Sequence, residues 1–109
     1  MAIDEGLATL LREDLNNIDG IEVKRMFGGL AFLLHGHMVC GVHKNGGMFR
    51  VGKSRMELAM AVPDTGPMNF TGRPMGGMVD VDDDLMADDA RRQKLVEMSL
   101  ENARSLPPK

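Results

Sequence analysis

Three histidines and the single cysteine fall within residues 35–43 and could bind a metal ion. They are His35, His37, Cys40 and His43, and imidazole nitrogen and thiolate sulfur are common zinc ligands. On one β-strand, however, His37 and His43 would lie about 20 Å apart, at ~3.3 Å per residue, and Cys40 would point to the opposite face. We therefore expect no metal site, no cofactor and no catalytic residue here. Cys40 is predicted to be a buried structural residue, because a buried thiol is a small hydrophobe rather than a nucleophile.

The glycine pairs could form phosphate-binding loops. The pair at residues 28–29 joins two predicted strands and opens no helix, so a helix dipole is missing there. The segment 72–77 (GRPMGG) lacks the Gly-Lys-Ser/Thr of a P-loop. We interpret the glycine pairs as tight turns, and no enzyme class is indicated.

Composition and charge limit the function classes further. The chain has 109 residues, which fits one domain. Its net charge is −3, but residues 23–78 carry an excess of Lys and Arg between two acidic ends. This basic middle either forms an anion site or packs beside acidic helices. Autonomous nucleic-acid binding is not expected, since Trp and Tyr are absent and no recognition helix is evident. Without a membrane-length apolar run, a signal peptide or a cysteine pair, we expect a cytoplasmic location.

The spacing of apolar and turn-forming residues predicts one α+β domain over residues 1–109, with a mostly antiparallel sheet of five or six strands. A capping box, Ser54 to Glu57, should begin the short middle helix, and Asp82–Asp84 should cap a turn at Leu85–Met86. The predicted helices are 4–16, 55–61 and 88–106, and the predicted strands are 21–27, 30–34, 37–43, 48–52, 68–71 and 78–81.

Strand alternation assigns the faces of this sheet if both hairpin loops contain two residues, so that Leu34 faces His37 and Lys44 faces Gly47. The expected core face carries Ala31, Leu33, Met38, Cys40, Val42, Phe49 and Val51. The expected second face carries Leu30, Phe32, Leu34, His37, Val39, His43, Met48 and Arg50. The second face is too apolar to be fully solvated, so either a second copy of the chain or a helix of the same chain should cover part of it.

Four segments resemble the N-terminal domain of the TfoX/Sxy family: 25–32 (RMFGGLAF), 36–38 (GHM), 72–78 (GRPMGGM) and 103–109 (ARSLPPK). The resemblance covers nearly the whole chain. It implies a two-layer α+β domain similar in outline to secretion chaperones. It also implies a role in regulating natural competence genes together with a catabolite-activator-type regulator, and no enzyme reaction. Full-length family members carry a second, helical domain, whereas this chain ends after the first.

The leading hypothesis is therefore a non-enzymatic interaction domain that serves a regulatory complex and forms a homodimer through the second face. The predicted interaction surface combines Arg25 and Arg73 as anion or carboxylate contacts with Phe27 and Met75 as adaptable apolar contacts. Core packing of Phe27 and Met75, and ion pairs of the two arginines with the acidic helices, are the alternatives. A small-ligand-binding domain and an accessory DNA-contacting module are the other functions considered.

Overall fold

The chain forms a six-stranded antiparallel sheet in the order β1-β2-β3-β4-β6-β5. The structure is a computed structural model that describes residues 5–26, 29–43, 46–69 and 74–107. Its strands are β1 Ile21–Met26, β2 Gly29–Leu34, β3 His37–His43, β4 Gly46–Arg50, β5 Thr65–Asn69 and β6 Pro74–Asp82. Its helices are α1 Glu5–Asp14, the 3₁₀-helix η1 Lys53–Arg55, α2 Met56–Met60, α3 Asp83–Ala87 and α4 Asp89–Ser105.

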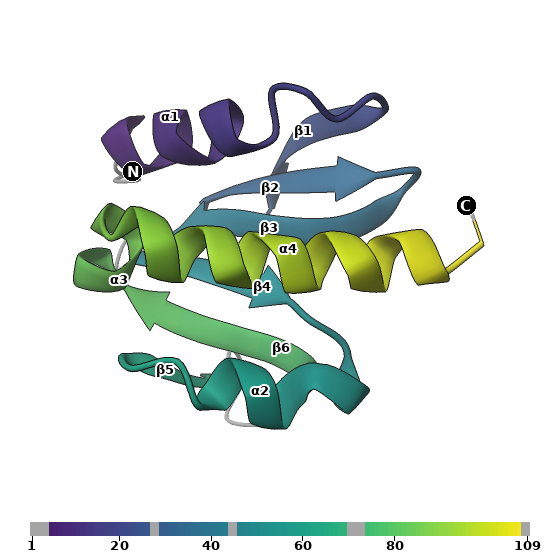
Figure 1. Ribbon diagram of the computed structural model, residues 1–109. Coiled ribbons are helices and arrows are strands. Elements are labelled where there is room, and N and C mark those ends of the chain that lie inside the picture. The colour runs from purple at the N-terminus through teal and green to yellow at the C-terminus, as the bar shows by residue number, and fades with distance from the viewer. Residues whose placement is uncertain (1–4, 27–28, 44–45, 70–73, 108–109) are drawn as a thin grey trace.

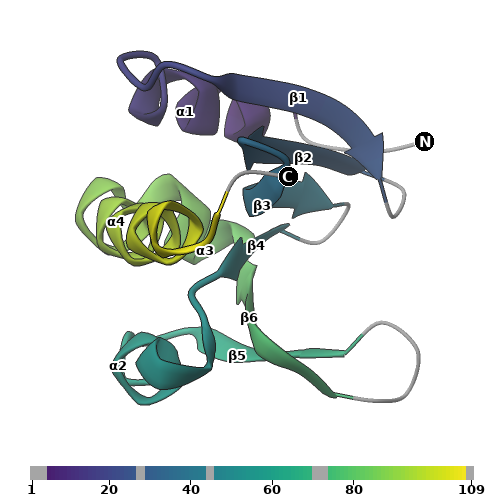
Figure 2. The ribbon, with the colours of Figure 1, turned by 90° about the vertical axis from the view of Figure 1, so that its right-hand side faces the viewer.

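The helices all lie on one face of the sheet (Figures 1 and 2). The long helix α4 crosses β3 and β4, with α1 beside it toward β1 and α2 beside it toward β5 and β6. This arrangement confirms the predicted α+β architecture and the order of its helices and strands. In the part of the chain that the structure describes, no helix is long and apolar enough to span a membrane.

The predicted cap at Asp82 is correct, and Asp88, the first residue of the predicted last helix, also acts as a cap. The Asp82 carboxylate accepts a hydrogen bond from the backbone N–H of Leu85 (2.9 Å), and Asp88 accepts one from the backbone N–H of Arg91 (3.1 Å). The Ser54 capping box is wrong. Residues 53–55 form a 3₁₀ turn, in which the Met56 N–H bonds to the Lys53 carbonyl, and no side chain caps η1 or α2.

Two of the glycine pairs lie in strands rather than in the predicted tight turns, whereas of the pair at residues 28–29 only Gly29, the first residue of β2, is among the described residues. Gly46 and Gly47 belong to β4, and β6 begins at Pro74, so it includes the last four residues of the segment 72–77. Close packing accounts for a glycine in β4, because a Cβ at Gly47 would lie 2.5 Å from the Met86 sulfur. These glycines therefore allow close approach within the sheet.

A β-bulge between β2 and β3 changes the predicted faces. Leu34 pairs with His37 as expected and Leu33 with Met38, but Phe32 pairs with Cys40, so Val39 is an extra residue. Because of this extra residue, each side chain of β2 lies on the opposite face of the sheet from the one predicted, when residues 40–43 of β3 are taken as the reference. The β3–β4 register also differs, with Val42 opposite Gly47, but this shift of two residues preserves the faces.

The residues on the helix-covered face therefore agree only in part with those predicted for the core face. Cys40, Val42, Phe49 and Val51 lie in the main core as expected, and His43, Met48 and Arg50 face the other way as expected. Leu30, Phe32, Leu34, His37 and Val39, assigned to the second face, are on the helix-covered face instead. Ala31, Leu33 and Met38, assigned to the core face, form a separate buried cluster with Met48 and Met78.

One apolar cluster on the second face is already buried within one chain. Ala31, Leu33, Met38, Met48 and Met78 are each at most 7% exposed, although no described helix lies over them. These side chains need no second copy of the chain to leave water. The homodimer through this face stays a prediction.

Candidate functional site

The four predicted interaction residues do not form one continuous surface in the described structure. Arg25 is exposed near the end of β1, and Met75 is the second residue of β6, with three strands between them. The strand pairing places Arg25 level with Val81, about 20 Å along β6 from Met75 at ~3.3 Å per residue. Phe27 and Arg73 lie outside the described residues. Arg25 makes no ion pair with a described residue.

His37 and His43 have separate structural partners. His37 Nε2 is 2.6 Å from the Pro107 carbonyl oxygen, at the end of α4, and His43 Nε2 is 2.6 Å from Asp80 Oδ1. Because of the bulge, Cys40 shares the helix-covered face with His37, contrary to the prediction. Burial raises the pKa of the Cys40 thiol, and the negative charge of Asp14 raises it further. Among the described residues, no three His, Cys, Asp or Glu side chains are grouped to hold a metal.

Some of the charged residues of the helices form ion pairs. Arg92 of α4 is buried and bonds to Asp14 of α1, with Nε 2.7 Å from Oδ2. From the basic middle of the chain, Arg55 lies 3.6 Å from Glu101 of α4. This last pair fits the expectation that basic and acidic segments pack together, whereas the Arg92–Asp14 pair was not foreseen.

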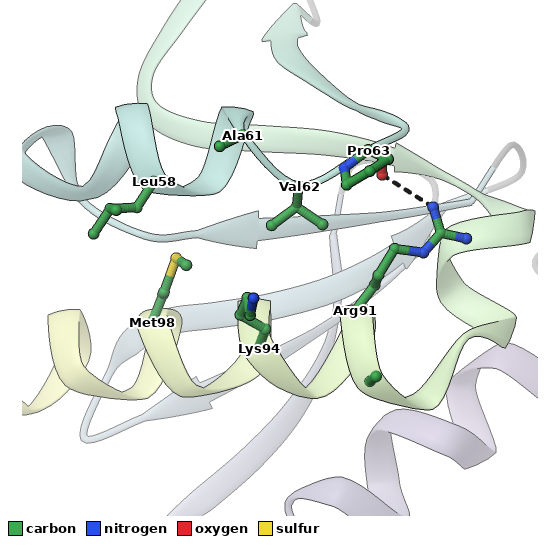
Figure 3. Close-up of a pocket in the computed structure, with 8 residues that line it drawn as sticks. Leu58, Ala61, Val62, Pro63, Arg91, Lys94 and Met98 are labelled. Carbon is green, nitrogen blue, oxygen red and sulfur yellow. Dashed lines mark hydrogen bonds between the residues drawn. The ribbon is translucent and has the colours of Figure 1, made fainter.

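A groove of about 480 Å³ runs between α2 and α4 (Figure 3). Leu58 and Val62 approach it from one side and Met98 from the other, with Lys94 beside Met98 on α4. Leu58 is 63% exposed, the largest value among the large hydrophobic side chains that the structure describes. The described lining residues are Leu58, Ala61, Val62, Pro63, Ala90, Arg91, Lys94 and Met98.

Arg91 fixes one end of this groove. Its guanidinium contacts Asp64 Oδ2 at 2.7 Å, the Pro63 carbonyl at 3.1 Å and Asp88 Oδ2 at 3.0 Å. The hydrogen bond to Asp64 is the largest cause of the raised pKa of Arg91. The segment after α2 is thereby tied to the start of α4, and the groove is preformed rather than opened by its ligand.

The depression continues along α4 toward the C-terminus. A second hollow of about 420 Å³ shares Leu58, Lys94 and Met98 with the first and reaches Arg104. Between Ala90 and Arg104 the helix rises about 21 Å, at ~1.5 Å per residue, which is the length of about four helical turns. Sequence reasoning missed this groove, because α2 and α4 are brought together only by the fold. The available signal was an apolar residue, Leu58, that the helix pattern left unburied.

Comparison with known proteins identifies the family of the chain. A family model described as the TfoX N-terminal domain matches residues 13–103. The chain belongs to this family. The match begins in the last two residues of α1, ends in the last turn of α4 and includes every strand of the sheet. The same comparisons find no match among curated proteins and none among solved structures.

Proposed function

We propose that this TfoX N-terminal domain is a non-enzymatic protein-interaction domain of a cytoplasmic transcription-regulating complex, and that the α2–α4 groove is its binding site. The observation that carries the proposal is the chemistry of the groove. The described lining of the 480 Å³ hollow is mainly aliphatic and thioether side chains with two cations, and its continuation toward Arg104 adds the carboxylates of Glu97 and Glu101. Such a surface supports burial of apolar side chains and offers no convergent set of groups for catalysis.

The occupant that fits this groove is an amphipathic helix of a protein partner. The groove along α4 matches about four helical turns in length, and Leu58, Val62 and Met98 provide an apolar floor for residues at three- and four-residue spacing. Lys94 stands exposed on the rim, where it favours an acidic residue on the polar side of the partner. Methionine adapts to different apolar partners, so Met98 suits this role.

The resemblance to the TfoX/Sxy family supplies the class of partner. We take it to be a catabolite-activator-type transcription regulator, and the process to be the control of competence genes. Predicted contacts of Arg25, Phe27, Arg73 and Met75 would then belong to other surfaces of the domain. An autonomous DNA-binding role is not part of the proposal, and a gel shift at low salt would detect one.

The test compares two aspartate substitutions on the same helix. Leu58→Asp changes a residue of the groove, and Met60→Asp changes a residue of α2 that is 39% exposed and not among the groove residues. Both should leave the thermal unfolding midpoint nearly unchanged, because both sites are exposed. We expect Leu58→Asp to weaken binding to the purified regulator at least tenfold, as measured by biolayer interferometry, and Met60→Asp to have little effect.

The same pair of variants tests the function in cells. In a strain that lacks the chain, competence-gene transcripts should be restored by the wild type and by Met60→Asp, but not by Leu58→Asp. Wild-type chain that does not bind the regulator, or equal effects of the two substitutions, would show that the groove is not the binding site for this partner.

A further inference from the structure

The sheet ends on one side in β1, an edge strand suited to pairing with another strand. β1 pairs with β2 in an uninterrupted register over six residues and contains neither proline nor glycine. The opposite edge, β5, contains Gly66 and Pro67 and has an irregular register. Proline and bulges block further pairing at the β5 edge, whereas β1 has neither and carries only charged side chains as protection, which a partner strand with complementary charges can satisfy.

The side chains of β1 add an exposed apolar residue between opposite charges. Val23 is 43% exposed and is the only strand residue among the large exposed hydrophobics that the structure describes. Through its pairing with Phe32, Val23 belongs to the helix-covered face. Glu22 and Lys24 pair with Leu33 and Ala31, so both belong to the other face, and both are exposed.

We propose that β1 pairs with β1 of a second copy of the chain, in an antiparallel register centred on Val23. A two-fold axis perpendicular to the sheet places the helix-covered faces of both chains on the same side of the joint sheet. Each residue of β1 must therefore lie opposite a residue from the same face of the partner strand. This is possible only if the axis passes through a residue pair, so the register is centred on one residue. Centred on Val23, the strand places Val23 against its own copy. Glu22 then faces the partner's Lys24, and Lys24 faces the partner's Glu22.

The neighbouring registers are electrostatically unfavourable. A register centred on Lys24 opposes two lysines, and one centred on Glu22 opposes two glutamates. Like charges directly opposite destabilise a strand pair, whereas opposite charges and paired β-branched residues stabilise it. Of the three registers, only the one centred on Val23 pairs Glu22 and Lys24 with opposite charges and covers the exposed valine. The resulting dimer has one continuous sheet through both chains.

This interface lies at the other edge of the molecule from the α2–α4 groove, as Figure 1 shows. The dimer therefore leaves both grooves accessible and does not depend on the function proposed for them. A dimer would present two copies of the groove to a partner that is itself two-fold symmetric, which raises the effective concentration of the second contact.

A charge exchange tests the register. The wild-type chain should elute in size-exclusion chromatography with light scattering at a mass that rises toward two chains with concentration. Glu22→Lys alone and Lys24→Glu alone should each weaken self-association about tenfold, since two opposite-charge pairs become like-charge pairs. The double variant restores both pairs and should restore the dimer. Lys53→Glu, an equal charge change at an exposed site of η1, should have no effect.

A cysteine on the two-fold axis tests the geometry independently. Directly opposed residues in an antiparallel pair have Cα atoms about 4.5–5.5 Å apart, within the range for a disulfide. Val23→Cys should therefore crosslink two chains under mild oxidation, whereas Leu58→Cys, exposed at the other edge, should not, and the native Cys40 is buried. Each of three results would overturn the proposal. The wild-type chain could stay monomeric at its solubility limit, or the dimer could form equally well in the single charge variants. Alternatively, Val23→Cys could crosslink no more than Leu58→Cys.

Discussion

Removing the carboxylate of Asp14 should destabilise the domain by about 2.5 kcal/mol. Asp14 and Arg92 connect α1 to α4, and their side chains are only 9% and 3% exposed. Breaking a buried ion pair by removing one partner costs ~3–5 kcal/mol, because it leaves an uncompensated buried charge. In Asp14→Ala, Arg92 keeps its hydrogen bond to the Met86 carbonyl (2.9 Å) and its contact with Asp89 (2.9 Å), so we expect the cost to be below that range.

The assay is thermal unfolding followed by far-ultraviolet circular dichroism, since the chain has no Trp or Tyr for fluorescence. An unfolding entropy of ~2.1 cal/mol/K per residue gives roughly 0.23 kcal/mol/K for this chain, so the midpoint should fall by about 11 °C. The matched control is Asp89→Ala. Asp89 also contacts Arg92 but is 75% exposed, and its loss should cost less than about 0.5 kcal/mol. Equal losses for the two variants would refute the argument from burial.

Three further predictions follow from single contacts. The hydrogen bonds from the backbone and side chain of Arg91 hold the pKa of Asp88 below its usual 3.8. The contribution of the Asp88 carboxylate to the free energy of unfolding should therefore be fully present above that pH, and it should be lost as the pH falls through the lower pKa that Asp88 has in the folded chain. Asp88→Asn, which can still cap the helix, should flatten this acid dependence in pH-jump denaturation; an unchanged slope would contradict it. Cys40 should react with a thiol reagent only after denaturation, because it is fully buried with a raised pKa; rapid labelling of the native chain would disprove this. Gly52→Ala should destabilise by about 1–3 kcal/mol, because Gly52 has φ +88°, a backbone conformation that residues with a side chain rarely adopt. Gly66→Ala is the control, because Gly66 has no positive φ and nothing lies within 4 Å of an added Cβ, and a similar loss there would show that the backbone conformation is not the cause.

Most helices and strands were predictable because their signals are local. The leucines of α1 repeat at helical spacing, and Leu7, Leu11 and Leu15 are buried as that pattern requires. The carboxylates of Asp82 and Asp88 need only the next turn of backbone to act as caps. Ser54 had the right neighbours for a cap as well. Its failure shows that a local signal can be overridden by a 3₁₀ turn that follows a glycine with positive φ.

The candidate site was much less predictable than the fold. The resemblance pointed to Arg25, Phe27, Arg73 and Met75, whereas the groove depends on Leu58 and its neighbours meeting α4 across the domain. Periodicity within α2 cannot reveal such a meeting, because it describes one helix at a time. The open edge at β1 was also invisible in the sequence, since strand order is a property of the whole sheet.

By itself the sequence determined the α+β class, the order of helices and strands and the family. These follow from spacing, capping and motif order along one chain. Only the tertiary structure decided which face of the sheet each residue of β2 occupies, because the extra residue Val39 of β3 reverses these faces and its position depends on how β3 pairs with β2. It also decided the burial of the Asp14–Arg92 pair. The two residues are far apart in sequence, and their attraction is strong only where packing between α1 and α4 has excluded water.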